Sequence, residues 1–386
     1  MRISKLSNRP RVFNRSSILT SGFLVTLLLV QAACLYPGLD SLLDPPMVVE
    51  TVSGDWIHVL FTIPRYPDDG YHVGGLDEEL AAIIGQAQSR VDVAAYDIDL
   101  DRVSHALLAA HRDGVMVRVV VESDNLDKQE NQAIVDTLRR AGVPVVEDGR
   151  ASGLMHNKFV VIDGQWVWTG SWNMTANGSY RNNNHAVLIA SPALAENYTA
   201  EFEEMFAGQF GPTSPANTPH PIITITVDTD DTGAGETRQV IIENYFSPED
   251  GVAAEIIAQI EQAQSRIRFL AFAFTSELIA DAMLERAQAG VVVQGVVEAR
   301  NITSNYSQYD RLRRAVHDVL PDGNPYIMHH KVIIIDDTTV ILGSYNWTAS
   351  ADTRNDENLL IIHDPEVAAL FVAEFGRIYE QARTQD

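Results

Sequence analysis

Two stretches of the chain contain the same order of apolar patterns. In each, apolar residues recur every four positions, which places them on one face of an amphipathic helix. The positions are Leu76, Leu80 and Ile84 in the first stretch and Val252, Ile256 and Ile260 in the second. A segment at the end of each helix, residues 86–90 and 262–266, has the identical sequence Gln-Ala-Gln-Ser-Arg. The chain therefore contains an internal repeat, which is the first organisational signal to follow.

Short apolar, β-branched runs follow each of these helices. The predicted strands are 91–98, 115–121, 159–162, 166–169 and 186–189 in the first copy, and 267–274, 291–297, 332–335, 340–342 and 359–362 in the second. A helix that ends at a glycine (Gly114, Gly290) separates the first two strands of each copy, which predicts parallel pairing through a right-handed crossover. The uninterrupted apolar runs 159–162 and 332–335 indicate strands buried on both faces.

Each copy closes with a predicted helix, over 193–210 and 365–382. The fold class is therefore α/β, with two tandem α/β/α sandwich repeats that each hold a mixed sheet between helical layers. We place the repeats at 57–210 and 241–386, with a linker at 211–240. Within that region, 222–227 and 239–242 are predicted to form a hairpin that bridges the halves. Two independent, related domains are the alternative reading of the duplication.

The residues suited to chemistry lie in a motif that occurs twice. They are His156, Lys158, Asp163, Ser171 and Asn173 in the first copy, and His329, Lys331, Asp336, Ser344 and Asn346 in the second. Each residue is separated from its counterpart by the same 173 positions, as between 156 and 329.

Each copy supplies half of the catalytic groups needed to cleave a phosphodiester. Covalent catalysis at phosphorus needs one imidazole to attack and another to protonate the leaving oxygen, and each copy offers one histidine. The lysine two positions later shares a strand face with that histidine, and the asparagine follows a Gly-Ser turn. Two ammoniums and two amides at one point would stabilise charge on the phosphoryl oxygens. We therefore assign phosphate binding to both Lys, both Asn and both Ser, and expect neither a metal nor a cofactor.

The paired pattern His-x-Lys-x4-Asp-x6-Gly-Ser-x-Asn resembles the phospholipase D superfamily, and the resemblance covers essentially the whole chain after its N-terminal segment. That family includes phospholipases, cardiolipin synthases, endonucleases and tyrosyl-DNA phosphodiesterases. The resemblance implies that the two halves pack about a pseudo-twofold axis and share one active site. It also implies that the His, Lys and Asp of both motifs are catalytic residues, with His156 as the nucleophile and His329 as the acid.

Glu357 is a further catalytic candidate, because it occupies the position where the family usually carries an acid that bonds and orients the histidine. The equivalent residue of the first copy, Asn184, has no charge. The halves are thus electrostatically unequal, and the carboxylate that supports the first-half site is left open. Asp163 and Asp336 have an alternative role as well, since each ends a buried strand and could bond local backbone.

Several other residues have two readings. His330, beside His329, would point away from it on a strand and is expected to be buried rather than to bind a metal. Glu122 and Glu298 are equivalent residues at strand ends, near where α/β sites open. Trp172 and Trp347 could line the substrate-binding site or pack in the core.

The N-terminus differs from the rest of the chain. Basic residues without an acid precede an apolar run at 18–30, and Ala32-Ala33 stand before the only cysteine, Cys34. This order predicts an export signal over 1–33 with Cys34 acylated as in a bacterial lipoprotein. The expected location is the cell envelope, either membrane-attached or secreted. A signal-anchor is the remaining alternative, although the run is short against the roughly 17–25 residues of a spanning helix.

The formal net charge of −24 bears on the substrate. Sequence-independent nucleic-acid binding rests on many Lys and Arg contacts with phosphates, which such an acidic chain disfavours. A phospholipid offers a single diester, so we expect a phospholipid substrate, membrane contact through the N-terminus and a monomer. A nucleic-acid phosphodiesterase and a cardiolipin synthase-like phosphatidyl transferase are the alternatives.

Overall fold

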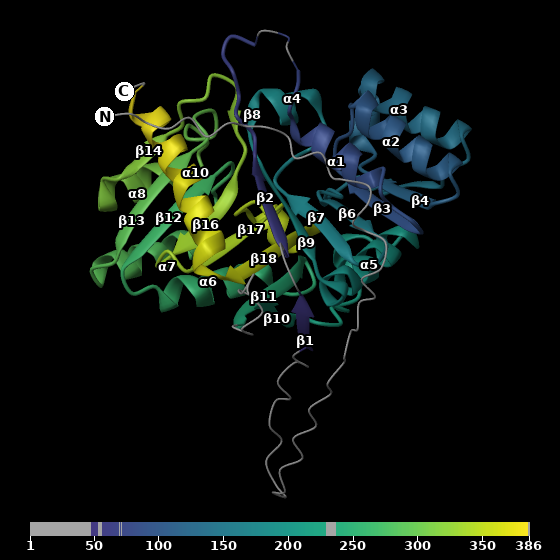
Figure 1. Ribbon diagram of the computed structural model, residues 1–386. Coiled ribbons are helices and arrows are strands. Elements are labelled where there is room, and N and C mark those ends of the chain that lie inside the picture. Colours follow the sequence, from purple (N-terminus) through teal and green to yellow (C-terminus); the bar gives the residue numbers. More distant parts are fainter. Residues whose placement is uncertain (1–47, 53–55, 69, 71, 229–236, 385–386) are drawn as a thin grey trace, which may run out of the picture. The chain divides into compact units, whose positions relative to one another are not determined.

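The computed structural model describes residues 48–52, 56–68, 70, 72–228 and 237–384, all within one compact unit from Gly38 to Asp386 (Figure 1). The predicted export signal and Cys34 lie outside these residues. Among the described helices, none combines the length and apolar character needed to cross a bilayer.

The first half forms a seven-stranded mixed sheet. In spatial order its strands are β2 (Ile57–Phe61), β9 (His185–Ala190), β7 (Trp166–Gly170), β6 (Lys158–Ile162), β3 (Arg90–Ala95), β4 (Met116–Val121) and β5 (Val145–Glu147). The predicted parallel pairing of β3 with β4 is confirmed, and β6, β7 and β9 run antiparallel to their neighbours. The helical elements of this half are α1 (Leu76–Ile84), α2 (Asp101–Arg112), η1 (Asp124–Asp127), α3 (Gln129–Arg140), α4 (Ala176–Tyr180) and α5 (Pro192–Phe206).

The second half repeats this sheet and extends it at one edge to nine strands. In spatial order the strands are β1 (Val48–Val52), β10 (Ile222–Asp228), β11 (Thr237–Ser247), β18 (Glu357–His363), β17 (Thr339–Gly343), β16 (Lys331–Ile335), β12 (Arg266–Ala271), β13 (Val292–Val297) and β14 (Val319–Pro321). The helical elements are η2 (Gly211–Thr213), which precedes β10, and α6 (Val252–Gln262), α7 (Glu277–Gln288), α8 (Tyr309–Val316), α9 (Ala349–Thr353) and α10 (Pro365–Arg383).

The predicted hairpin forms as the antiparallel pair β10–β11, but it does not stand between the halves as a separate bridge. β11 pairs with β18, so both strands belong to the second sheet, and β1 joins the outer side of β10 in parallel. The reason is visible in the sequence of β10, where Ile223, Ile225 and Val227 alternate with polar residues and are buried in the core.

The two sheets share one central core. Strand β6 is buried along its whole length, with Phe159 and Val161 in the central core and Val160 and Ile162 in an outer core beneath α1, α2 and α3. The central core also holds residues of β16, β17 and β18 and of the helices α5 and α10. Each half is therefore an α/β/α sandwich, and its inner layer is buried against the other half.

Candidate active site

Backbone bonds across the two halves place both motif histidines. The N–H of His156 donates to the carbonyl of Asp356 at 3.0 Å, and the N–H of His329 donates to that of Asn183 at 2.9 Å. Beside the second bond, β8 (Asn182–Asn183) pairs in parallel with β15 (Ile327–Met328), which belongs to the other half. Each histidine is thus held by the half that does not carry it.

Both histidines line one cavity of 760 Å³. Asn173 also lines it, together with the aromatic rings of Tyr96 and Phe272. The two motifs, distant in sequence, therefore meet at one site, and the reading as two independent domains with separate sites is wrong.

His156 is bonded by a carboxylate of the opposite half. Its Nδ1 lies 2.6 Å from Oε2 of Glu357, a short charge-assisted contact. Burial raises the pKa of Glu357 to about 7 against the opposing effect of Lys158. Burial and the two motif lysines lower the pKa of His156 well below its usual range. The ring is therefore held neutral, with Nδ1 engaged and Nε2 left for reaction, and the carboxylate that supports the first-half site is Glu357.

His329 has neutral partners instead. Its Nδ1 lies 2.9 Å from Oδ1 of Asn184 and 3.0 Å from the carbonyl of Ser171. The amide of Asn184 is fixed in this orientation because its Nδ2 donates to the carbonyl of Gly178 at 3.0 Å. With two acceptors around it, Nδ1 carries a hydrogen, which leaves Nε2 as the ring nitrogen that can accept a proton. Burial, Lys331 and Lys158 lower the pKa of His329 well below its usual range.

The predicted phosphate-binding role of Ser171 and Ser344 needs correction. Both are fully buried, and Ser171 Oγ donates to Asn184 at 2.9 Å while Ser344 Oγ donates to Glu357 at 2.8 Å. The two hydroxyls therefore position Asn184 and Glu357. These two residues in turn contact the motif histidines. Each serine follows a glycine at positive φ, 147° at Gly170 and 150° at Gly343, where a Cβ would collide with the carbonyl of the neighbouring strand β9 or β18.

The two lysines predicted to bind phosphate are buried beside the motif histidines. Lys158 and Lys331 are 2% and 3% exposed, and each ammonium donates to the carbonyl of its own motif histidine, at 2.5 and 3.0 Å. Burial lowers the pKa of Lys158 to about 7, and burial together with Lys158 lowers that of Lys331. The charges of both lysines act on each histidine in the same direction as burial.

Asn173 and Asn346 each offer a buried side-chain oxygen that has no hydrogen-bond partner among the residues that the structure describes. Both residues precede a short helix whose cap is a threonine: Thr175 Oγ1 accepts from Gly178 N at 2.9 Å, and Thr348 Oγ1 accepts from Ala351 N at 3.2 Å. An unpaired buried amide oxygen is costly unless a ligand or water satisfies it. Each oxygen can accept only from a donor such as water or a hydroxyl, whereas a phosphoryl oxygen would be bonded by the Nδ2–H of the same amide.

The structure does not bring Asp163 and Asp336 to the site, which corrects their catalytic assignment. Each stands at the far end of β6 or β16 from its lysine, roughly 17 Å along the strand. The carboxylate of Asp163 accepts from the backbone N–H of Gln88, Ser89 and Arg90 at 2.8, 2.7 and 2.9 Å. Asp336 repeats these bonds with Gln264, Ser265 and Arg266. The repeated Gln-Ser-Arg sequence is therefore the partner of the motif aspartate.

Glu122 and Glu298 are positioning groups just behind the site. Each is buried, and each accepts a hydrogen bond at 2.7 Å from the N–H of the methionine that precedes the motif histidine. Burial raises both pKa values to about 7. Their equivalence in sequence was the signal for this shared role.

The remaining candidates belong to the interior. Trp172 and Trp347 are each 2% exposed and pack in the outer cores, so neither walls the substrate. His330 is buried as predicted, with Nε2 3.0 Å from Glu374 Oε1 and Nδ1 3.0 Å from Nδ1 of His185.

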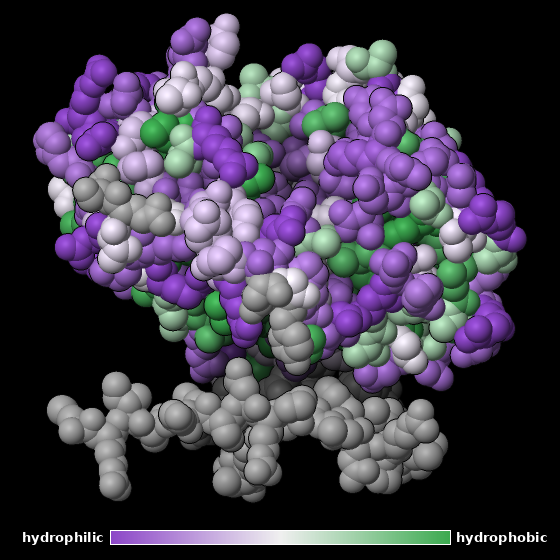
Figure 2. Space-filling model, turned by 90° about the horizontal axis from the view of Figure 1, so that it is seen from above, coloured by the Kyte–Doolittle hydropathy of each residue, from purple (hydrophilic) through white to green (hydrophobic). Residues whose placement is uncertain are grey.

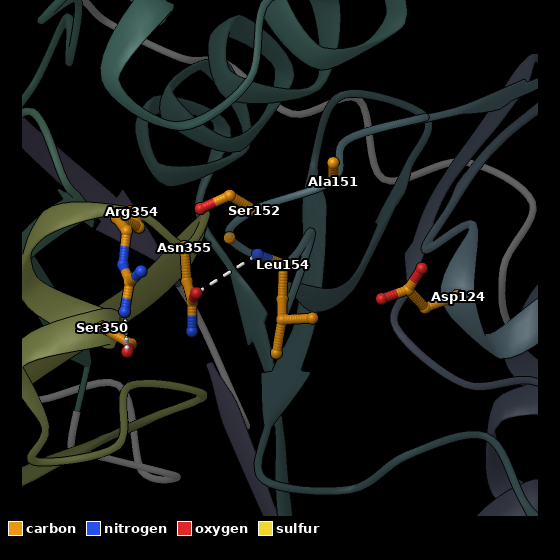
Figure 3. A pocket seen from close by; sticks show the side chains of 8 residues that line it. Asp124, Ala151, Ser152, Leu154, Ser350, Arg354 and Asn355 are labelled. Atoms are coloured by element: carbon orange, nitrogen blue, oxygen red, sulfur yellow. Dashed lines mark hydrogen bonds between the residues drawn. The ribbon is translucent and has the colours of Figure 1, made fainter.

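A second, polar cavity of 330 Å³ lies at the junction of the halves (Figure 3). Leu154 and Asn355 line it, joined by a 3.1 Å bond from the N–H of Leu154, and they are two residues from His156 and Glu357. Asp124 faces them from the opposite wall, across from Arg354 and Ser350. This cavity is thus lined by residues of both halves.

Comparison with known proteins agrees with this geometry. The family model described as "Cardiolipin synthase, PLD-like domain" matches residues 80–206 and 256–379, well over half of the chain. The chain belongs to the phospholipase D superfamily. The two matched segments of this phospholipase D-like chain are the two repeats, and each holds one His-Lys motif.

Curated relatives within the superfamily match over one repeat's length. Phospholipase D of Rickettsia conorii is 38% identical over 131 residues, covering 34% of this chain and 66% of the relative. Human mitochondrial cardiolipin hydrolase is 36% identical over 132 residues, covering 34% of this chain and 52% of the relative. The chain thus spans between half and two thirds of these relatives' length.

Among solved structures, the phosphatidylserine synthase of Haemophilus influenzae superposes with a TM-score of 0.57 at 14% identity, covering 84% of this chain and 86% of that one. Identity this low supports the fold alone. The match extends over both halves, which confirms the tandem arrangement.

Proposed function

We propose that this protein is an exported phosphodiesterase of the phospholipase D type, which hydrolyses or transfers a phospholipid phosphodiester through a phosphohistidine intermediate. The observation that carries the proposal is the meeting of His156 and His329 at one cavity, each with Nδ1 engaged and Nε2 free to react. The names of the Rickettsia and human relatives, a phospholipase and a cardiolipin hydrolase, support a lipid substrate.

His156 is the nucleophile in this scheme. Its Nε2 attacks phosphorus, and the phosphorylated ring carries a positive charge. Glu357, 2.6 Å from Nδ1, compensates that charge. His329 has only neutral acceptors on Nδ1, so its protonated ring is less stabilised than that of His156 would be. It therefore gives up a proton from Nε2 more readily than His156, which suits the role of general acid.

The proton balance closes with these two rings. As the bond from phosphorus to the leaving oxygen breaks, His329 Nε2–H protonates that oxygen. His329 then takes a proton from water or an alcohol, whose oxygen attacks phosphorus and breaks the P–N bond. Arrival of the anionic diester offsets the charge of the two lysines and so raises the pKa of His329, whose ring then takes up a proton from solvent. Lys158, Lys331 and the two Asn amides stabilise the phosphoryl oxygens without requiring a metal.

The charged groups around the cavity favour a lipid over a nucleic acid. Of the cavity's cations, Lys128 is paired with Asp97 at 2.7 Å and Arg181 with Asp68 at 2.7 Å, while Arg300 is more open. Binding a polyanion needs several unpaired Lys or Arg contacts along the backbone. Figure 2 shows a mainly hydrophilic face on which apolar residues gather in several patches, the most extended of them at the right of the view.

The decisive experiment traps the covalent intermediate. With a p-nitrophenyl phosphodiester, whose leaving group needs little protonation, His329→Ala should release one equivalent of p-nitrophenol and accumulate an acid-labile adduct on His156, seen by mass spectrometry. His156→Ala should form no adduct. An adduct on His329 in the His156→Ala protein would reverse the two roles, and absence of an adduct in both variants would refute covalent catalysis by these histidines.

The substrate class is tested by comparing vesicles of phosphatidylethanolamine or phosphatidylcholine with plasmid and oligonucleotide at matched salt, with EDTA present throughout. Release of head group with intact DNA is expected. Efficient DNA cleavage without head-group release would favour the nuclease alternative, and activity that depends on an added divalent metal would refute the metal-free scheme.

Export rests on the N-terminal sequence. We expect cleavage before Cys34 and acylation of that residue, which mass spectrometry of the mature N-terminus decides. A product beginning after Cys34 would indicate free secretion, and a retained segment 1–33 would indicate a signal-anchor.

A further inference from the structure

An aromatic ring stands beside the histidine and the lysine in each half. The centroids of Tyr96 and His156 are 4.6 Å apart at an interplanar angle of 66°, and those of Phe272 and His329 are 4.6 Å apart at 64°. The ammonium of Lys158 lies 4.7 Å from the centre of the Tyr96 ring, and that of Lys331 lies 4.8 Å from the centre of the Phe272 ring. The same geometry therefore occurs twice, although the aromatic residue differs.

Equivalent hydrogen bonds fix the backbone that carries the two rings. Tyr96 and Phe272 directly follow β3 and β12, and their N–H groups donate to the residue after the motif histidine at 3.1 and 2.9 Å. Their carbonyls accept from Asn125 and Asn301 at 2.5 and 2.6 Å. These bonds fix the backbone from which each ring projects, so both rings start from equivalent positions beside the lysines.

The lysines need such support because each is buried and each repels the other. Glu357 is the acid that opposes this repulsion at both ammoniums, and Asp97 and Glu122 contribute at Lys158 alone. Within the described part of the chain, each ammonium makes one hydrogen bond, to a backbone carbonyl, which compensates little of the cost of burying its charge. The negative face of an aromatic ring attracts a cation most strongly where water is excluded.

We propose that Tyr96 and Phe272 are positioning residues of the phosphate site, whose ring faces keep the Lys158 and Lys331 ammoniums charged and in place beside the two histidines. The inference rests on the proposed function, because the task of the charged lysines is to hold the phosphoryl group. Both rings line the catalytic cavity, so they also separate the ammoniums from bulk water.

The expected effect has a definite sign. A lysine binds phosphate while it is protonated, so activity falls as the pH rises through the pKa of that lysine. Removing a ring destabilises the ammonium and lowers this pKa. The alkaline limb of kcat/KM should therefore move to lower pH by about 0.5 to 1.5 units, the range expected for a desolvated cation–π contact.

The test measures kcat/KM for bis-p-nitrophenyl phosphate from pH 5 to 10. Tyr96→Leu and Phe272→Leu should both shift the alkaline limb, whereas Tyr96→Phe and Phe272→Tyr should restore it to the wild-type position. Tyr326→Leu is the matched control, because its ring lines the same cavity with Arg181 rather than a lysine over it. An unshifted limb in both leucine variants, or an equal shift in the control, overturns the inference.

A variant that keeps the shape of the ring guards against misfolding. Trifluorophenylalanine at position 272 weakens the negative ring face with little change in size, and it should move the limb in the same direction. Calorimetric binding of inorganic phosphate at pH 6.5 and 8.5 gives a readout apart from turnover, with a larger loss at pH 8.5 in the substituted proteins. A wild-type protein without diesterase activity would instead refute the proposed function, while unchanged phosphate binding would refute the role of the rings.

Discussion

Replacing the buried histidine pair by asparagines should make the protein more resistant to acid. His185 and His330 are fully buried, their rings stack at 5.3 Å and 6°, and their Nδ1 atoms lie 3.0 Å apart. At the equivalent place in the other half, Asn358 Nδ2 donates to Asn157 Oδ1 at 2.8 Å. The double variant His185→Asn/His330→Asn therefore copies a pair that this fold already contains.

The sign follows from the direction of the pKa shifts. Burial, His330 and Lys331 lower the pKa of His185 well below its usual range. Burial also lowers the pKa of His330, against the opposing effect of Glu374, while Arg377 and Lys331 act in the same direction as burial. A group with a depressed pKa that is neutral when folded stabilises the fold above its unfolded pKa, near 6.5, and this stability is lost as the pH falls.

The size of the pH effect on the free energy of unfolding depends on the proton that each histidine binds when the chain unfolds. Each histidine that stays neutral in the fold costs about 1.4 kcal/mol per pH unit below 6.5, or about 2 kcal/mol at pH 5. Since Glu374 reduces the shift of His330, the pair together should contribute about 2–4 kcal/mol between pH 7.5 and 5. The smaller asparagines leave a cavity, which lowers stability by a similar amount at every pH.

The assay is urea unfolding of wild type and double variant at pH 7.5, 6.5, 5.5 and 5.0. At pH 7.5 the variant should have a lower free energy of unfolding than wild type. Between pH 7.5 and pH 5 this difference in free energy should move by about 2–4 kcal/mol in favour of the variant, so that it shrinks or changes sign. His105→Asn, on the exposed side of α2, controls for losing an imidazole as such. Parallel curves for wild type and double variant, within about 0.5 kcal/mol, would refute the reasoning.

Three further predictions test the assignments at the site. Glu357→Gln should lower kcat/KM by about 10- to 100-fold, because it removes a charged bond to His156 worth about 1.5–3 kcal/mol; steady-state kinetics that match wild type would exclude this role. Asp163→Asn should lower the free energy of unfolding by about 1–2 kcal/mol while the folded enzyme keeps kcat/KM within about twofold, and a large loss of turnover would restore the catalytic assignment. Residues 34–210 and 241–386, produced separately, should each be inactive as monomers and recover activity only when combined; turnover by one monomeric half would contradict the shared site.

The elements and the meeting of the motifs could be predicted from the sequence because both depend on local pattern. The continuous apolar run 159–162 marks a strand buried on both faces, and β6 is such a strand. Two motifs that each lacked a partner histidine predicted one shared site.

The partners across the halves could not be predicted, because they depend on how the two sheets pack. Glu357 lies 201 residues from His156, and nothing in the spacing shows that it serves the first-half histidine rather than the nearer His329. The two Ser residues bond partners within their own repeat, Asn184 and Glu357, but these roles become visible only once those partners are seen to contact the histidines of the other half. The aspartates are different: the repeated Gln-Ser-Arg segments carried the signal that Asp163 and Asp336 bond backbone.

Duplication gives two equal half-sites, whereas the proposed reaction needs two unequal histidines. The inequality is found in the residues that touch the histidines. The partner of His156 is a carboxylate and that of His329 a neutral amide, so one ring is favoured when it carries the phosphoryl group and the other when it gives up a proton. Because each partner comes from the opposite half, a change at position 184 or 357 alters the histidine of the other repeat. The two copies could therefore take on different chemical roles only as one folded unit.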